Sequence, residues 1–175
     1  VFLTTEERLT VLPREEERVA GLISGTYLNH MWQGEKKQSD FFLLKGMVEQ
    51  LFASLGLTAD VTFKQTEQAD FHPGRTATIL LKGEPIGIIG QVHPALEDEW
   101  HLDESYAFEL TIEPLFNQAN QMVLYQGVPK FPSIGRDIAL VVDQHIPVAD
   151  LTTVIEEAGG SLLKQVNLFD LYEGE

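Results

Sequence analysis

Residues 76–92, Thr-Ala-Thr-Ile-Leu-Leu-Lys-Gly-Glu-Pro-Ile-Gly-Ile-Ile-Gly-Gln-Val, decide the fold of this chain. Apolar and β-branched residues predict two short strands here, over 76–82 and 86–92. Gly83-Glu84 between them is typical of a two-residue turn with glycine first. Because Pro85 has no N–H to donate, we expect it to face an unpaired edge or to lie in the turn. The stretch therefore predicts an antiparallel β-hairpin.

Further strands are predicted on both sides of this hairpin, over 19–28, 61–64 and 106–112. Between the first two, apolar residues recur every three or four positions, which predicts a helix over 40–55. Ser39 is the expected N-cap, Asp40 favours the helix dipole, and Gly56 is the expected stop. A short helix is expected after Pro94. Together these elements indicate an α+β fold.

The last third of the chain predicts a second, smaller pattern. Proline, asparagine, glutamine and glycine interrupt any period over 113–130, which indicates a connector. A strand over 137–143 follows, then a helix that begins at Pro147 and ends at Gly159-Gly160, then a strand over 166–172. The order is β-α-β.

Composition excludes several classes of protein. The chain has 175 residues, of which 43% are hydrophobic, and no cysteine, so disulfides and thiolate sites are excluded. It contains no apolar run long enough for a membrane span, and we expect a cytoplasmic location. A net charge of -15 argues against a free-standing nucleic-acid binder. Because the chain begins at Val1, we expect a fragment of a larger protein.

Two histidine-proline pairs, at His72 and His93, are the first candidates for chemistry. Together with Arg75 they would suit a stand-alone hydrolase or transferase, or a metal site. The alternative is structural, with each imidazole bonding backbone at a strand end and Arg75 pairing with a carboxylate or capping backbone carbonyls in its turn. Gly83, Gly87 and Gly90 lack the dinucleotide spacing and are expected to mark close packing.

Six segments carry a more specific signal, in one order and spacing. They are Phe42-Leu-Leu-Lys45-Gly46, Phe71-His72-Pro-Gly74-Arg75-Thr-Ala77, Ile86-Gly87-Ile-Ile-Gly90-Gln-Val-His93-Pro94, Phe108-Glu109-Leu110, Lys130-Phe131-Pro132-Ser-Ile-Gly-Arg136-Asp137-Ile-Ala-Leu140 and Val166-Asn-Leu168-Phe169-Asp170-Leu-Tyr172-Glu-Gly174. With these segments the chain resembles the C-terminal part of the bacterial phenylalanyl-tRNA synthetase beta subunit.

This resemblance implies a catalytic-like domain over 1–115, a linker over 116–128 and a partial ferredoxin-fold anticodon-binding domain over 129–175. The first would have the antiparallel sheet of class II synthetases without its catalytic residues, since no arginine follows the glycine-rich strand. His72, Gly74, Arg75 and His93 would be structural. A generic protein-interaction domain unrelated to translation is the remaining alternative.

The resemblance also implies partners. The alpha subunit would carry the active site of an alpha2beta2 ligase that uses ATP and Mg²⁺, and this fragment would need no cofactor and bind no metal. The helix over 40–55 is one candidate interface with the alpha subunit; the alternative is that it packs only on its own sheet.

In the partial ferredoxin domain, Lys130, Phe131 and Arg136 are the candidate contacts with tRNA(Phe). The alternatives are that Phe131 fills a core position at the domain junction and that Arg136 forms an ion pair with Asp137. Residues 129–175 carry a net charge of -5, which argues against useful affinity in isolation. In the usual split topology a third strand lies between the first two. We therefore expect the two strands of this half to need another pairing partner.

Overall fold

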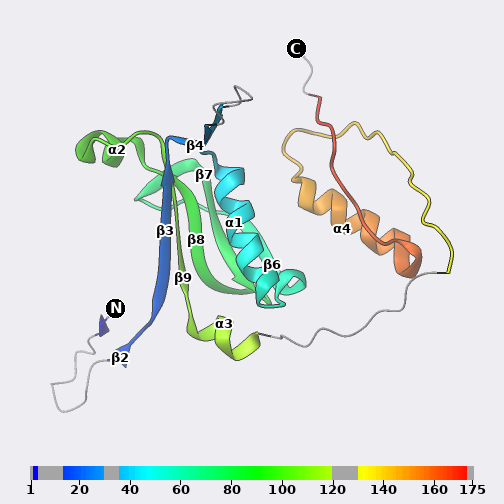
Figure 1. Cartoon of the computed structure of the whole chain (residues 1–175), viewed down its shortest axis with the longest axis horizontal. Coiled ribbons are helices and arrows are strands. Elements are labelled where there is room, and N and C mark those ends of the chain that lie inside the picture. The colour runs from blue at the N-terminus through cyan, green and yellow to red at the C-terminus, as the bar shows by residue number, and fades with distance from the viewer. Residues whose placement is uncertain (1, 4–13, 30–35, 120–129, 173–175) are drawn as a thin grey trace. The chain divides into compact units, whose positions relative to one another are not determined.

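The computed structural model describes residues 2–3, 14–29, 36–119 and 130–172. The chain divides into two compact units, Val1–Tyr125 and Gln126–Glu175. Figure 1 shows a sheet and helices in the first unit and one main helix in the second.

The first unit is built on a five-stranded antiparallel sheet with the order β3-β9-β8-β7-β6. Its strands are β3 (Arg18–Ser24), β6 (Val61–Gln65), β7 (Phe71–Leu81), β8 (Glu84–Val92) and β9 (Ser105–Thr111). The predicted hairpin is confirmed as β7–β8. The mixed α and β character is confirmed as well, with all pairs of this sheet antiparallel.

The turn of the hairpin differs by one residue from the prediction. Leu81 pairs with Glu84, so the turn residues are Lys82 and Gly83, with φ of 52° and 85°. Positive φ at both positions is the type I′ geometry, which matches the twist of the flanking strands. Pro85 lies next to this turn, opposite Leu80, where the register shifts. The missing N–H therefore lies at an irregularity in the β7–β8 pairing, and neither at an unpaired edge nor in the turn as expected.

The strand expected over 19–28 is two strands. Gly25, with φ of 68°, ends β3, and β4 (Thr26–Asn29) pairs with β5 (Lys36–Gln38) in a separate two-stranded sheet. A left-handed backbone favours glycine and interrupts a strand, which the apolar pattern alone did not reveal. Another two-stranded sheet joins β1 (Phe2–Leu3) to β2 (Arg14–Glu15).

Helix α1 (Phe41–Ser54) confirms the predicted helix but not its predicted cap. The side chain of Asp40 accepts the Leu43 N–H at 2.6 Å, so Asp40 is the N-cap in place of Ser39. At the other end Gly56 has φ of 72°, and the Leu57 N–H donates to the Phe52 carbonyl at 3.0 Å. This is a Schellman ending, as expected of a glycine stop.

The core lies between α1 and one face of the sheet (Figure 1). Leu44, Val48 and Phe52 are each 1% exposed and come from one side of the helix. Burying side chains of this size contributes about 1.5–3 kcal/mol each. Their partners on the sheet are Ile79, Leu81, Ile86, Ile89 and Leu110.

Three short helices complete the first unit: η1 (Thr58–Asp60), α2 (Pro94–Trp100) and α3 (Glu113–Gln118). The second confirms the predicted helix after Pro94. Helix α3 corrects the connector expected over 113–130. The first residues of that segment are helical, and Leu115 among them is 4% exposed. Residues 120–129 of that connector lie outside the described residues.

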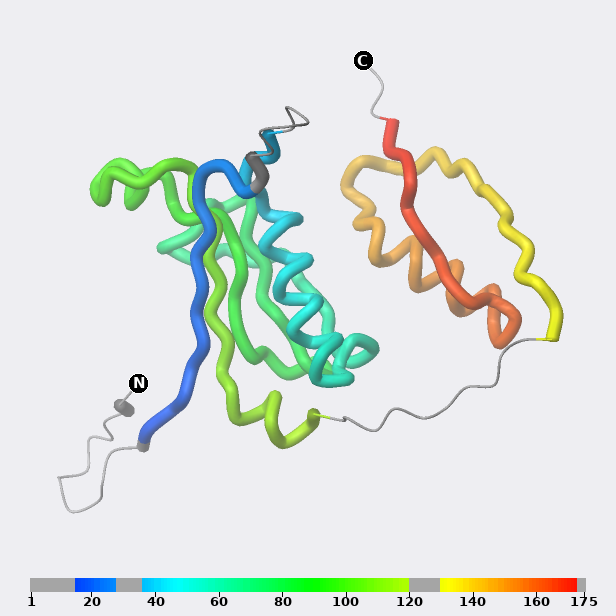
Figure 2. The backbone as a smooth tube through the Cα atoms, viewed as in Figure 1, coloured from blue at the N-terminus to red at the C-terminus, as the bar shows by residue number. Residues whose placement is uncertain are grey.

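In the second unit, α4 (Val148–Gly159) follows Pro147 and ends at Gly160, as predicted, and η2 (Gly160–Leu162) follows it. The two strands expected over 137–143 and 166–172 are wrong as strands, since neither segment has sheet pairing (Figure 2). In the split topology their common neighbour is a third strand. The described residues supply no such strand.

Candidate functional site

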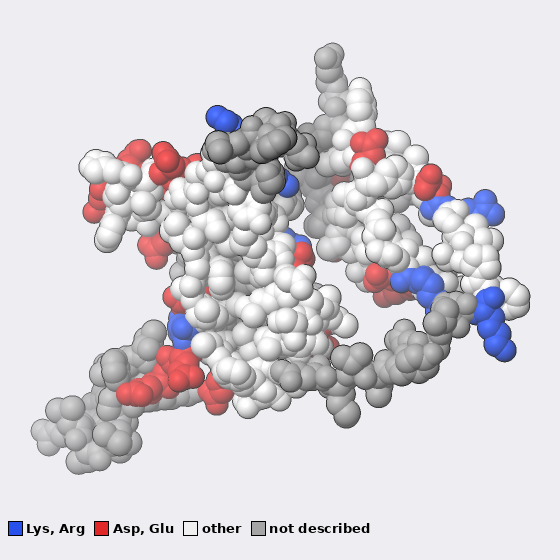
Figure 3. All heavy atoms as spheres, in the orientation of Figure 1, with Lys and Arg blue, Asp and Glu red and all other residues white. Residues whose placement is uncertain are grey.

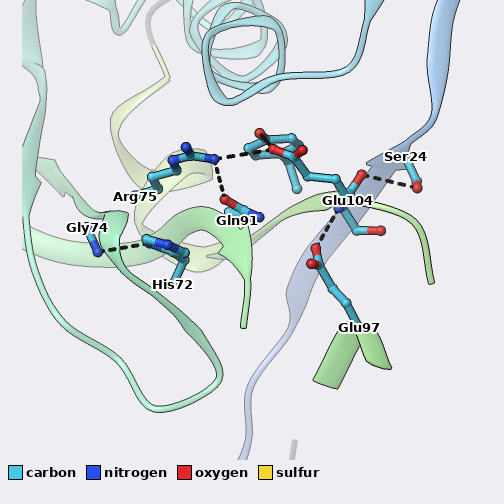
Figure 4. A network of polar contacts seen from close by, with 9 residues as sticks. Ser24, His72, Gly74, Arg75, Gln91, Glu97 and Glu104 are labelled. Atoms are coloured by element: carbon cyan, nitrogen blue, oxygen red, sulfur yellow. Dashed lines mark hydrogen bonds and ion pairs between the residues drawn. The ribbon is translucent and has the colours of Figure 1, made fainter. Parts of the chain in front are cut away.

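The two histidine-proline pairs lie at one end of the β7–β8 hairpin, where Phe71 pairs with Val92. The His72 Nδ1 accepts the Gly74 N–H at 3.0 Å (Figure 4). The His93 Nδ1 accepts the Ala95 N–H at 3.2 Å and so caps α2. Each imidazole therefore orders the backbone two residues further along the chain.

Metal binding needs several ligands that converge on one point. Among the described residues there is no group of three or more His, Asp and Glu side chains that could hold an ion. The two imidazoles are each engaged locally, so the geometry gives no support to the stand-alone enzyme.

Arg75 lies at the centre of a polar network (Figure 4). Its Nη1 donates to the Gln91 Oε1 at 2.8 Å and to the Glu104 Oε1 at 3.3 Å. The Tyr106 hydroxyl donates to the same Glu104 oxygen. Gln91 and Tyr106 face each other on β8 and β9, so the sheet register brings these groups together.

The network raises the pKa of Tyr106 from 10.0 to about 12. Burial of the phenol is the larger cause, because it disfavours the phenolate, and the hydrogen bond to Glu104 adds to it. Tyr106 is 3% exposed. It therefore acts as a hydrogen-bond donor and keeps its proton at neutral pH.

Two further contacts fix the segment that carries Glu104. The Glu97 Oε1 accepts the Ser105 N–H at 2.7 Å, which ties α2 to the start of β9. The Ser24 hydroxyl donates to the Glu104 carbonyl at 3.3 Å. Glu97 is nearly buried, so its carboxylate is a structural acceptor.

This arrangement limits what Arg75 can bind. Arg75 and Glu104 form an ion pair in which both side chains are more than half exposed, so the pair contributes little stability by itself. Glu104 lies beside the guanidinium and offsets part of its positive charge, which nucleotide chemistry would require at such a site.

The glycines of β8 have a packing role. A Cβ on Gly87 would lie 2.2 Å from the Glu109 carbonyl oxygen, and one on Gly90 would lie 2.9 Å from the Arg75 carbonyl oxygen. No real side chain tolerates the first distance. Close packing, as the spacing indicated, accounts for both.

Lys130, Phe131 and Arg136 lie in an irregular, exposed segment of the second unit. Phe131 is 83% exposed, so within its unit it is not a core residue. Among the described ion pairs none joins Arg136 to Asp137. The described contacts therefore support neither a core role for Phe131 nor an ion pair for Arg136.

Sequence reasoning missed the partners of Arg75. The sequence indicated a carboxylate partner for Arg75 without identifying Glu104, and it placed Tyr106 only in the strand expected over 106–112. Their contact depends on the register of β8 against β9. The available signal was Arg75 itself, which lies between Gly74 and the strand predicted over 76–82.

Comparison with known families sets this geometry in context. Residues 1–112 match the model of the phenylalanyl-tRNA synthetase beta chain CLM domain. The chain belongs to the phenylalanyl-tRNA synthetase beta chain family. Residues 129–175 match the ferredoxin-fold anticodon-binding domain.

Relatives in this beta chain family are similar over all 175 residues. The phenylalanine–tRNA ligase beta subunits of Shouchella clausii and Bacillus subtilis are each 50% identical to the chain, and that of Geobacillus kaustophilus is 47% identical. The match covers 100% of this chain and 22% of each relative. The chain thus spans about a fifth of the length of these beta subunits.

Proposed function

We propose that this chain is a non-catalytic part of the beta subunit of a phenylalanine–tRNA ligase. In this role it supports assembly with an alpha subunit into an alpha2beta2 enzyme and contributes part of an anticodon-arm module. The observation that carries the proposal is the similarity to beta subunits over all 175 residues of this chain. The ion pair of Arg75 with Glu104 supports the non-catalytic part of it.

The sheet of the first unit is proposed to be a degenerate class II synthetase sheet. Its antiparallel order and the row of glycines in β8 support this. We propose three parts of the chain: a core over 1–115, a linker over 116–128 and an anticodon-binding part over 129–175.

The described residues do not fit the ATP and Mg²⁺ of the whole ligase. Arg75 already has a carboxylate partner, and the described side chains include no cluster that could hold a metal. We therefore assign no step of amino-acid activation to this chain. Adenylate formation belongs, in this proposal, to the alpha subunit.

The anticodon-arm role is assigned to the segment with Lys130, Phe131 and Arg136. An exposed aromatic ring in a segment with two basic residues suits stacking against an unpaired base and contact with phosphate. The net charge of -5 over 129–175 means that other surfaces have to supply most of the affinity. The proposed role is thus local positioning of tRNA.

A pair of assays tests the proposal. The full-length polypeptide that carries this chain is expected to copurify with the alpha subunit and to support charging of tRNA(Phe). The same polypeptide without the alpha subunit is expected to give no phenylalanine-dependent ATP–pyrophosphate exchange. Exchange by the polypeptide alone would contradict the non-catalytic role, and failure to copurify would contradict the role in assembly.

In the described part of the chain no helix is long and apolar enough to cross a membrane.

A further inference from the structure

The outer face of α1 has the composition of a contact surface. Opposite the buried side of the helix, Phe42 is 76% exposed and Met47 is 38% exposed. Gly46 lies on the same outer side, and the Lys45–Glu49 pair is its main charged feature. A surface helix normally carries polar and charged residues on its outer face. In α1 the exposed Phe42 and Met47 add apolar surface to a face that also carries Glu49 and Gln50.

No contact within the described chain explains why position 46 is a glycine. A Cβ built on it would have nothing within 4 Å, and its backbone is ordinary α-helix. Glycine in a helix interior costs about 1 kcal/mol relative to alanine. Its remaining physical advantage is that another backbone can approach closely at this position. Gly87, where a Cβ would meet the backbone of β9 at 2.2 Å, shows this use of glycine inside the sheet.

A shallow groove of about 560 Å³ surrounds Gly46. It lies between α1 and the β4–β5 hairpin, and Phe42 and Met47 form part of its wall. The full lining is Tyr27, Lys37, Asp40, Phe42, Leu43, Gly46, Met47 and Gln50. The groove is open, and the apolar side chains in its lining, Phe42, Leu43 and Met47, belong to one helix, which suits the apolar face of an amphipathic helix.

The charged residues at one end of the groove indicate what kind of protein segment could bind there. Asp40 is already used, because its carboxylate caps α1 through the Leu43 N–H. Lys37, by contrast, has no ion pair or side-chain hydrogen bond with any residue that the structure describes. A carboxylate on the occupant would complement this cation. Figure 3 shows few charged side chains in the region of α1 and acidic ones gathered over α2.

We propose that this groove binds an amphipathic helix of the partner subunit, packed against Gly46 with an acidic residue facing Lys37. The proposal rests on the assembly role given above and assigns it a surface. The occupant's apolar stripe would lie between Phe42 and Met47, and its smallest side chains would lie over Gly46. A nucleic acid is disfavoured here because Lys37 is the single basic residue in the lining, which also contains the acidic Asp40.

Gly46→Leu, made in the full-length polypeptide, tests the close approach. Leucine improves helix propensity, so α1 is expected to form, while its side chain fills the groove. We expect the dissociation constant for the purified alpha subunit, measured by biolayer interferometry, to rise at least tenfold. Ala53→Leu is the matched control, since Ala53 is exposed on the same helix outside the groove, and it is expected to stay within about twofold.

Lys37→Glu tests the charge. It is expected to weaken binding at least fivefold at low salt, with a smaller effect at high salt because charge interactions are screened there. Lys36→Glu, at the neighbouring exposed position outside the groove, is the control and is expected to change little. Equal effects of the two changes would contradict the assigned role of Lys37.

A photo-reactive amino acid at Met47 identifies the occupant. The proposal expects a cross-link to a helix of the alpha subunit that carries a carboxylate, mapped by mass spectrometry. A cross-link to tRNA, to a second copy of this chain or to another part of the same polypeptide would overturn it. If the wild-type polypeptide binds the alpha subunit and Gly46→Leu binds equally well, this inference fails while the assembly role stands. If the wild-type polypeptide does not bind, the assembly role fails first.

Discussion

At the scale of single residues, two glycines predict opposite effects of one substitution. Gly87→Ala forces a Cβ against the Glu109 carbonyl, and we expect it to lower the free energy of unfolding by about 1–3 kcal/mol. Gly46→Ala meets open space in a helix and is expected to raise it by about 1 kcal/mol. Urea unfolding of the chain, followed by circular dichroism, measures both. Effects of the same sign would contradict the packing described here.

Tyr106 predicts a pH dependence. Since its pKa is raised to about 12, the protonated phenol stabilises the fold fully below about pH 10, and this contribution is lost as the pH rises through the folded-state pKa. The difference in unfolding free energy between wild type and Tyr106→Phe is expected to shrink over that range.

Ultraviolet titration of the phenolate checks the cause of this shift. In Glu104→Gln the pKa of Tyr106 is expected to fall but to stay above its ordinary value, because burial is the larger cause and remains. Titration of Tyr106 together with exposed tyrosines in the wild-type chain would refute the buried, hydrogen-bonded phenol.

The sequence located the residues of the polar network better than their partners. His72, Arg75 and His93 were singled out because histidine before proline and arginine beside glycine are local patterns. Glu104 was not paired with Arg75, because the two meet only through the pairing of three strands. Contacts across a sheet depend on register, which a single sequence specifies weakly.

At the scale of elements, the N-terminus of α1 gives a direct test. Asp40→Ala removes the acceptor for the Leu43 N–H and is expected to cost about 1 kcal/mol of unfolding free energy. Ser39→Ala is the comparison, because Ser39 was the expected cap, and it is expected to cost only a few tenths of a kcal/mol. Thermal unfolding of both variants decides between the two positions. A larger loss from Ser39→Ala would restore the cap expected from the sequence.

Elements with strong local signals were predicted well, and those that depend on neighbours were not. The hairpin β7–β8 and the helices α1, α2 and α4 have periodicity, proline or glycine at their ends. The segments 137–143 and 166–172 have apolar residues, but the described chain lacks the third strand that would pair with both of them. Without that neighbour their backbone groups have no strand to hydrogen-bond with. The break at Gly25 also escaped prediction, since an apolar run gives no indication of a left-handed residue.

At the scale of the whole molecule, charge predicts how the chain behaves with tRNA. With a net charge of -15, we expect no measurable binding of isolated tRNA(Phe) up to about 100 µM at physiological salt. Fluorescence anisotropy of labelled tRNA measures this directly. Tight binding by the chain alone would show that local basic residues outweigh the overall charge.

The junction at Gly25 has a consequence for how this family can vary in length. The Gly25 carbonyl accepts the Ser39 N–H at 2.8 Å, so the excursion through β4 and β5 leaves and rejoins the domain at one hydrogen-bonded point. Lengthening a loop whose ends are already joined adds little closure entropy, about 0.6 kcal/mol for each doubling. Insertions between these two residues can therefore accumulate in different lineages while the sheet and α1 keep their places.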